Sequence, residues 1–221
     1  MTELFRWDWA VDNLDDIWTS TVEHVWLTFL AVAIGFVISF PLAILAFRHR
    51  RFYGPIIGVT GVLYTIPSLA LFAALVTFTG LSTTTAEVGL VSYTLLILVR
   101  NIVAGLDGVS DDAKEAAVGM GYTSRQMLWR VELPLAVPAI VAGLRIATVT
   151  TIGLVTVTAI IGKGGLGSLI LLGLNRSFAT AIVIGAVLSV LLAVLADLFL
   201  LLIERQIAPW ARGREQARSA A

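Results

Sequence analysis

The chain has 221 residues, of which 58% are hydrophobic and only 14% are charged. Its mean hydropathy of +0.92 excludes an ordinary soluble domain, whose surface has to face water. Fifteen basic residues balance fifteen acidic residues, so net charge indicates no nucleic-acid partner. The chain has no cysteine, which excludes disulfides, thiolate metal sites and iron–sulfur clusters held by this chain alone.

Five apolar stretches are long enough to cross a hydrocarbon core of about 30 Å, which requires roughly 20 residues of helix. They lack strand-like alternation, and a backbone in lipid must satisfy its polar groups internally, so we expect helices. The predicted fold is an all-α integral membrane bundle that forms one domain over residues 1–221. The predicted spans are Val22–Phe47, Gly54–Thr79, Val88–Leu106, Leu135–Ile161 and Phe178–Ile203.

The segment before the first span, residues 1–21, is acidic. A signal peptide begins with basic residues, so we expect no cleavage here. The segment also contains Trp7, Trp9 and Trp18, whose indole rings favour the boundary between headgroups and hydrocarbon. We therefore predict an interfacial helix ahead of the bundle.

Basic residues are distributed unevenly between the two sides of the predicted bundle, and cytoplasmic loops are enriched in Lys and Arg. The richer side is therefore predicted to be cytoplasmic, with the N-terminus outside and the C-terminus inside. The polar connection 107–134 and the basic tail 204–221 then lie in the cytoplasm. The richer side has Arg48, Arg50, Arg51, Lys114, Arg125, Arg130, Arg205, Arg212, Arg214 and Arg218, and the other side has Arg6, Lys163 and Arg176.

The connection 107–134 has the pattern of two short helices. Asp112 precedes Glu115 by three residues, and Thr123 precedes Gln126 by three residues. Both pairs fit a capping box, in which two side chains satisfy the free amides of a first helical turn. We therefore predict that each pair starts a helix.

Glycine and proline predict where these two helices end. Gly119 and Gly121 can end the first helix, because glycine tolerates left-handed dihedral angles. Pro134 is predicted to end the second helix, because proline disfavours the helical conformation in the residue before it. On physical grounds alone, the pair could be an amphipathic element that lies flat on the inner leaflet.

The stretch EAAVGMGYTSRQMLWRVELP, residues 115–134, resembles the cytoplasmic signature of permease subunits of bacterial ATP-binding-cassette importers. In that signature, E-A-A is followed by three residues, G, nine residues, I, one residue and L-P. The resemblance implies a coupling helix, which docks on the ATPase subunit and carries its ATP-driven closure into the membrane. The matching residues are Glu115, Ala116, Ala117, Gly121, Val131, Leu133 and Pro134, with Val131 in place of Ile as the one departure.

Three further stretches, Ile66–Phe72, Leu144–Gly153 and Ile160–Gly167, resemble the osmoprotectant permeases, which import glycine betaine, choline, carnitine or proline betaine. Methionine importers share the five-span layout, so a methionine-type or other small-solute importer is the alternative. The resemblance implies the type I importer permease fold in the bacterial cytoplasmic membrane. It also implies four kinds of partner: two ATPase subunits, a second identical or paralogous permease, an extracytoplasmic substrate-binding protein and membrane lipid.

We expect no ATPase site on this chain and no enzyme activity. A Walker loop needs Ser or Thr after its Gly-Lys pair, whereas Gly162 and Lys163 are followed by Gly164. ATP and Mg²⁺ would then bind to the partner ATPase, and no cofactor or metal is expected here. The glycines of 162–167 formally match a dinucleotide fingerprint but follow a membrane helix instead of a strand. We interpret Gly164, Gly165 and Gly167 as a flexible external hinge.

Polar residues inside the spans are candidates for the translocation path, because burying them in lipid is costly. Thr148, Thr151 and Thr158 share one face of the fourth span and could line a polar passage. Alternatively, their hydroxyls bond back to their own helix or to neighbouring helices. Pro67 is predicted to kink the second span, where it could act as a gate hinge or simply fit the packing.

Three charged residues, Arg100, Arg145 and Asp197, fall in the cytoplasmic third of their predicted spans. The arginines could extend to the interface. We hypothesise instead that Asp197 pairs with Arg100 or Arg145, because an unpaired carboxylate at that depth is destabilising.

Two other classes of membrane protein are disfavoured. A helical channel needs no coupling segment, and an intramembrane enzyme needs a catalytic constellation. The two histidines, His24 and His49, are predicted near opposite membrane faces, and the sequence contains neither H-E-x-x-H nor G-x-S-x-G.

Overall fold

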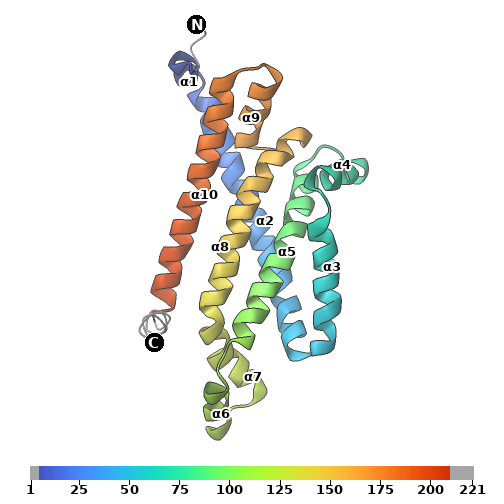
Figure 1. Ribbon diagram of the computed structural model, residues 1–221, viewed down its shortest axis with the longest axis vertical. Coiled ribbons are helices and arrows are strands. Elements are labelled where there is room, and N and C mark those ends of the chain that lie inside the picture. The colour runs from blue at the N-terminus through green and yellow to red at the C-terminus, as the bar shows by residue number, and fades with distance from the viewer. Residues whose placement is uncertain (1–4, 210–221) are drawn as a thin grey trace.

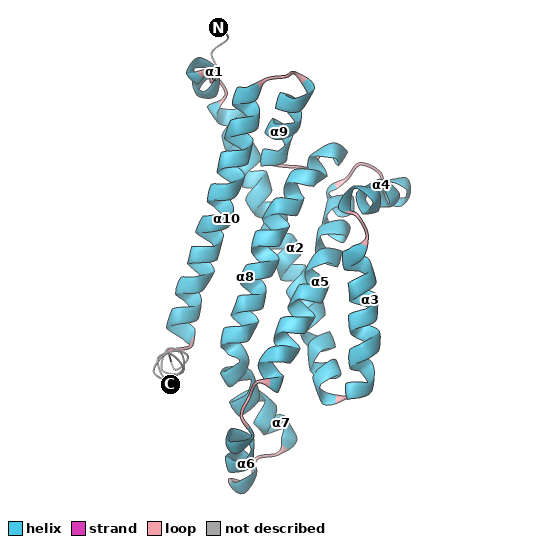
Figure 2. Ribbon diagram, viewed as in Figure 1, coloured by secondary structure: helices cyan, strands magenta, loops and turns pink. Residues whose placement is uncertain are grey.

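The computed structural model describes residues 5–209, and every regular element in this range is a helix. The helices form an elongated bundle, with α1, α4 and α9 at one end and α6 and α7 at the other (Figure 1). Figure 2 shows no strand in the described range, so the all-α prediction is confirmed. The outer parts of the predicted N-terminal segment and basic tail, residues 1–4 and 210–221, lie outside the described residues.

The first span is longer than predicted. A six-residue helix, α1 (Trp7–Asp12), leads into α2 (Leu14–Arg48), which has 35 residues and contains the predicted span. At 1.5 Å per residue, α2 is about 50 Å long, which exceeds the hydrocarbon thickness. At the junction, the side-chain amide Nδ2 of Asn13 donates to Trp9 O at 2.8 Å. The predicted interfacial helix is therefore short, and residues 14–21 are already part of the spanning helix.

The second predicted span, Gly54–Thr79, is broken in the structure. After a short turn, η1 (Arg50–Phe52), the chain forms α3 (Tyr53–Thr65) and α4 (Ser68–Thr79), which are bent by 94° at the break. Pro67 has no amide hydrogen, and Ile66 before it is extended, with φ −64° and ψ 128°. The predicted kink at Pro67 is therefore present, and at 94° it divides the span into two helices.

The core of the bundle lies between α2, α5 (Thr83–Asp107) and α8 (Leu133–Val157). Close backbone approach at glycines brings these helices together. A Cβ built on Gly105 of α5 would lie 2.9 Å from Ala139 Cβ of α8, and one on Gly143 would lie 2.5 Å from Asn101 Cβ. Small residues at helix crossings are typical of membrane bundles, in which dispersion between closely packed atoms drives association.

The connection between α5 and α8 contains α6 (Asp111–Gly119), α7 (Ser124–Met127) and a π-helical turn, η2 (Leu128–Glu132). α7, η2 and α8 continue into a 3₁₀ turn, η3 (Thr158–Ile161), and together form one apolar helix over Ser124–Ile161. The prediction that Pro134 ends a helix is wrong. Pro134 is the second residue of α8, which follows the π-helical turn, and a proline is tolerated in the first turn of a helix.

The chain ends with α9 (Leu166–Asn175) and α10 (Ala179–Ile207), and α9 was not predicted. The flexible-hinge interpretation of Gly164, Gly165 and Gly167 is also wrong. All three residues are buried, and a Cβ on any of them would clash, with Ala159, His24 and Thr156 respectively. This loop is therefore tightly packed.

By length and composition, four helices of the described range can cross a membrane, and a fifth span results if α3 and α4 count as one. The four are α2, α5, the continuous helix Ser124–Ile161, and α10. Their order and number agree with the predicted bundle, except that the second span is bent.

Candidate functional site

The candidate coupling element, α6 and α7 with the turn between them, projects from one end of the bundle (Figure 1). Ser110 is the N-cap of α6, and its side chain makes no capping hydrogen bond. The predicted capping box of Asp112 and Glu115 is therefore wrong, because the helix begins two residues earlier than that box requires. Asp111 and Asp112 instead occupy the first turn, where carboxylates interact favourably with the helix dipole.

Gly121 forms the sharp turn after α6. Its φ is +79°, a left-handed conformation that costs a residue with a side chain about 1 to 2 kcal/mol. The amide of Gly121 donates to Val118 O at 2.9 Å, and the amide of Tyr122 donates to Ala117 O at 3.0 Å. These bonds satisfy carbonyls at the end of α6. Gly119 is the last residue of α6, so the left-handed position belongs to Gly121.

The capping box predicted for α7 is confirmed. The Thr123 hydroxyl accepts from the Gln126 amide at 3.3 Å, and the Thr123 amide donates to Gln126 Oε1 at 2.8 Å. Together with Gly121, this box fixes the angle between the two short helices. The turn is therefore specified by local sequence.

The motif residues divide into an inward and an outward group. Ala117 of α6 and Leu133 of α8 are buried, with exposed fractions of 0% and 8%, so both face the interior of the protein. Glu115, Ala116 and Gly121 are exposed. Val131 and Pro134 are half-buried near the start of α8.

The outward face of α6 combines charge with exposed apolar side chains. Val118 and Met120 are 62% and 66% exposed. A shallow hollow of about 520 Å³ is lined by Asp111, Lys114, Glu115, Val118 and Gly119. Exposed apolar side chains beside charges are typical of a surface that contacts another protein.

Two arginines make polar contacts at the end of the bundle that carries the coupling element. Arg48 at the end of α2 donates from Nη2 to Ser124 O of α7 at 2.6 Å. Arg50 pairs with Asp107 at the end of α5, which joins the α2–α3 connection to α5. The coupling element is therefore hydrogen-bonded to α2 and continues directly into α8.

The three threonines predicted as path candidates donate their hydroxyls to backbone carbonyls of α8. Thr151 donates to Ala147 O and Thr158 to Val155 O, both at 2.7 Å, and both side chains are buried. Thr148 donates to Leu144 O at 2.7 Å. This side-chain-to-backbone bonding is the alternative that the sequence left open.

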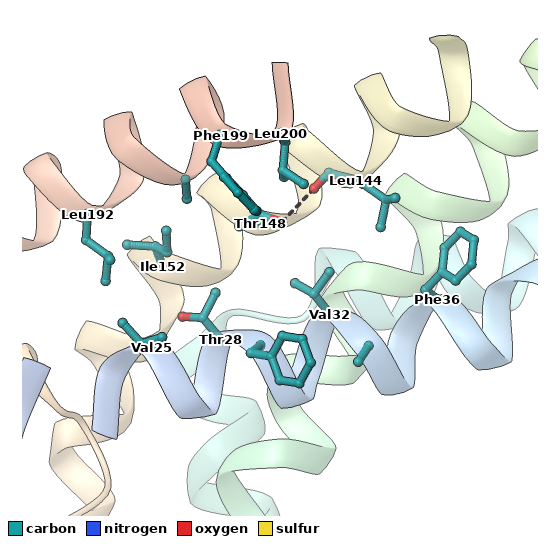
Figure 3. A pocket seen from close by; sticks show the side chains of 13 residues that line it. Val25, Thr28, Val32, Phe36, Leu144, Thr148, Ile152, Leu192, Phe199 and Leu200 are labelled. Atoms are coloured by element: carbon teal, nitrogen blue, oxygen red, sulfur yellow. Dashed lines mark hydrogen bonds between the residues drawn. The ribbon is translucent and has the colours of Figure 1, made fainter. Parts of the chain in front are cut away.

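Thr148 also lines an apolar groove of about 430 Å³ between α2, α8 and α10 (Figure 3). Figure 3 shows Val32, Phe36 and Phe199 among the side chains around this groove. The other polar residue of its lining is Thr28, and a groove with so little polarity suits hydrocarbon. Pro67 lies elsewhere, at the break between α3 and α4.

Of the three charged residues considered in the spans, the structure brings Arg145 and Asp197 together. Arg145 Nε lies 2.8 Å from Asp197 Oδ1, and Nη2 lies 2.9 Å from Oδ2. Arg100 is exposed on α5 and is not part of this pair. Sequence reasoning missed Glu204, whose Oε2 lies 3.6 Å from Arg145 Nη1. Its position seven residues after Asp197, about two helical turns, places it on the same face of α10.

Comparison with known proteins gives a family match over residues 31–209, to the model described as "Binding-protein-dependent transport system inner membrane component". The matched range includes the coupling element, the ion pair and all the helices from α3 to α10.

Several characterised proteins are similar over nearly the whole chain. The choline transport system permease protein OpuBB of Bacillus subtilis is 36% identical over 197 residues, which cover 89% of this chain and 91% of that protein. The osmoprotectant import permease protein OsmW of Salmonella typhimurium is 37% identical over 194 residues, which cover 86% and 90%. The carnitine transport permease protein OpuCD of Listeria monocytogenes is 36% identical over 193 residues, which cover 85% and 86%.

Solved structures share the fold. The inward-facing MetNI methionine ABC transporter contains a chain with a TM-score of 0.74 and 24% identity, covering 88% of this chain and 95% of that one. A chain in the crystal structure of an amino acid ABC transporter with histidines has a TM-score of 0.74 and 19% identity, covering 93% and 100%. At this level of identity, the likeness concerns the fold alone.

Proposed function

Because the chain belongs to the inner-membrane components of binding-protein-dependent transport systems, we propose that it is the permease subunit of an ATP-driven importer of compatible solutes. The substrates are glycine betaine, choline, carnitine or proline betaine. The observation that carries this proposal is the 36 to 37% identity, over at least 85% of the chain, to permeases named for choline, carnitine and osmoprotectants. The structural likeness to a methionine transporter concerns the fold and adds no support for methionine as substrate.

In this proposal, the end that carries α6 and α7 is cytoplasmic and the end that carries α1 and α9 is external (Figure 1). The support is the positive-inside rule. The basic residues Arg48, Arg50 and Arg51 lie in or beside the α2–α3 connection, at the same end as the coupling element. A substrate-binding protein would dock at the external end.

Coupling proceeds through a continuous helix. An ATPase subunit contacts the exposed face of α6 around Glu115 and moves it when its nucleotide sites close. Since α7, η2 and α8 form one helix over Ser124–Ile161, a displacement of α6 that passes through the turn at Gly121 reaches the middle of the membrane without crossing a further loop. The Arg48–Ser124 hydrogen bond transmits the same displacement to α2.

Two permease subunits and two ATPase subunits form the working assembly, with the passage between the permeases. The second permease is an identical or a paralogous chain. Binding-protein docking and ATP binding favour the outward-open state, and hydrolysis returns the assembly to the inward-open state. ATP and Mg²⁺ bind to the ATPase subunits. On this chain, the described residues contain no group of three His, Asp or Glu side chains placed to hold a metal ion.

The proposal is tested by reconstituting this chain with its ATPase and its binding protein in proteoliposomes. We expect ATP-dependent uptake of radiolabelled glycine betaine, choline or carnitine that unlabelled methionine does not compete. Glu115→Lys should abolish uptake while membrane insertion stays normal, because it reverses a charge on the docking face. Uptake of methionine alone, or full uptake by the Glu115→Lys transporter, contradicts the proposal.

A further inference from the structure

A second groove lies on the α8–α10 pair, and unlike the apolar groove of Figure 3 it contains charged side chains. Its volume is about 480 Å³. The two grooves share no lining residue. The residues that line the charged groove are Ala142, Arg145, Ile146, Val149, Thr150 and Asp197.

The Arg145 guanidinium has hydrogen-bond donors to spare. It carries five N–H groups, and its bidentate pair with Asp197 uses one on Nε and one on Nη2. Nη1 lies 3.6 Å from Glu204 Oε2, which is too far for a hydrogen bond. Three N–H groups of Arg145 are therefore free of a bond to these two carboxylates.

The charges at this site do not balance. Arg145 contributes one positive charge, and Asp197 and Glu204 contribute two negative charges within 3.6 Å of it. Glu204 Oε2 is buried without a hydrogen-bond partner. The three groups together carry a net negative charge beside apolar walls, so the site favours a ligand that brings a positive charge.

The ion pair is accessible from the groove. The side chains of Arg145 and Asp197 are 26% and 35% exposed, although both belong to helices that can cross the membrane. The walls beside them, formed by Ala142, Ile146 and Val149, are apolar. The groove therefore offers spare N–H donors, the Asp197 carboxylate and an apolar surface. Glu204 does not line it, but its charge lies 3.6 Å from Arg145.

We propose that this groove is a transit site for solutes that carry a quaternary ammonium group, and that it accommodates both zwitterions and cations. The inference rests on the proposed function and adds a binding site to it. A solute carboxylate accepts hydrogen bonds from the spare N–H groups of Arg145. The ammonium group has no N–H to donate, so it needs only the negative charge of Asp197 and Glu204 and apolar contact for its methyl groups.

A purely structural role of the Arg145–Asp197 pair, as a clip between α8 and α10, makes a different prediction. A clip needs the bidentate pair and the weaker contact with Glu204, but it does not distinguish one solute from another, and it is indifferent to the free volume of the groove. A transit site depends on the charge of the solute and on that volume. Two substitutions that keep the Arg145–Asp197 pair intact therefore separate the two roles.

The first substitution is Glu204→Gln, which brings the net charge of the site from −1 to zero. Choline carries a net positive charge, whereas glycine betaine is a zwitterion with none, so choline should lose more. In the full transporter in proteoliposomes, we expect choline uptake to fall about tenfold and glycine betaine uptake to fall much less. The measured quantity is the ratio of the two uptake rates at equal amounts of assembled complex.

The second substitution is Ala142→Leu, which fills the groove from its apolar wall. We expect it to lower uptake of both solutes at least fivefold while the ATPase of the complex stays active. Ala196→Leu is the matched control, because Ala196 lines the apolar groove on the other side of α10. It adds the same volume beside the ion pair and should leave uptake near the wild-type rate.

The inference is overturned if the wild-type transporter imports both solutes, and Glu204→Gln and Ala142→Leu leave the rates and their ratio unchanged. In that case the proposed function stands. If the wild-type complex imports neither solute with its ATPase and binding protein present, the proposed function fails and the inference fails with it.

Discussion

Gly35 of α2 packs directly against Thr94 of α5, with no space for a side chain between the two helices. A Cβ built on Gly35 would overlap Thr94 Oγ1 and would lie 3.0 Å from Thr94 Cβ. Thr94 is buried, and its hydroxyl donates to Val91 O at 2.8 Å within α5. This contact sets the separation of the two helices at the centre of the bundle.

Replacing Gly35 by Ala should therefore destabilise the bundle. Overpacking of a close helix crossing costs about 1 to 3 kcal/mol, because α2 must move away from α5. We expect a lower melting temperature for the purified Gly35→Ala protein in detergent, measured by the loss of monodisperse protein on heating. Gly58→Ala is the control, since Gly58 of α3 has nothing within 4 Å of its Cβ position. Equal melting temperatures for the two variants would contradict the packing role.

The spans were predictable because long apolar runs have few alternatives in lipid. The two prolines were harder to interpret. Pro67 interrupts an apolar run and produces a 94° bend, whereas Pro134 lies within a continuous helix that a π-helical turn accommodates. The conformation at each proline depends on neighbouring helices. At Pro67, the hydroxyl of Tyr93 from α5 donates to Ile66 O and contributes to the bend. That contact joins residues 27 apart in sequence, and local patterns cannot reveal it.

The coupling element was predictable where its geometry is local. The box of Thr123 and Gln126 and the turn at Gly121 follow from spacing and residue type. The packing of Gly165 against His24 was not predictable, because the two residues are far apart in the chain. The cost of an unpaired carboxylate in a span suggested that Asp197 pairs with an arginine. The contact of Glu204 with the same arginine, Arg145, becomes apparent only when α8 and α10 lie side by side.

Gly121 and Gly119 offer a matched pair of substitutions in the coupling element. Neither has an atom within 4 Å of its Cβ position, but only Gly121 has a positive φ, of +79°. Gly121→Ala should cost about 1 to 2 kcal/mol of turn stability through the backbone and should lower uptake. Gly119→Ala lies in α6, where alanine is favoured by about 1 kcal/mol. It adds only one methyl group at the edge of the hollow on α6 and should retain most of the uptake. The measurement is ATP-dependent solute uptake per assembled complex, and equal uptake by both variants would contradict a geometric role for the turn.

Tyr93 stabilises the break between α3 and α4. Its hydroxyl donates to Ile66 O, the carbonyl directly before Pro67, and its side chain is 6% exposed. Tyr93→Phe leaves that carbonyl without this donor, which costs about 1 to 3 kcal/mol. We expect faster amide hydrogen exchange over residues 63–70 with little change in α5.

Tyr64→Phe is the control for this experiment, because Tyr64 packs against the Tyr93 ring with centroids 5.8 Å apart but is itself 38% exposed. Removal of the Tyr64 hydroxyl should leave amide hydrogen exchange over residues 63–70 near the wild-type rate. A Tyr93→Phe protein with wild-type exchange in that segment would show that Pro67 alone maintains the bend.

Gly165 holds the loop before α9 against α2, and its replacement by Ala should be among the most damaging single changes. Its φ is +48°, and a Cβ there would lie 2.7 Å from both the backbone nitrogen and Cβ of His24. Because backbone atoms cannot rotate away, α2 or the loop must shift, and the hydrogen bond between His24 Nε2 and Ile152 O at 3.0 Å is then strained. Gly153→Ala, at a position of α8 with nothing within 4 Å, should be tolerated. We expect the Gly165→Ala protein to melt at least several degrees below the Gly153→Ala protein. Equal stability would mean that the loop is flexible after all, as its glycine content first suggested.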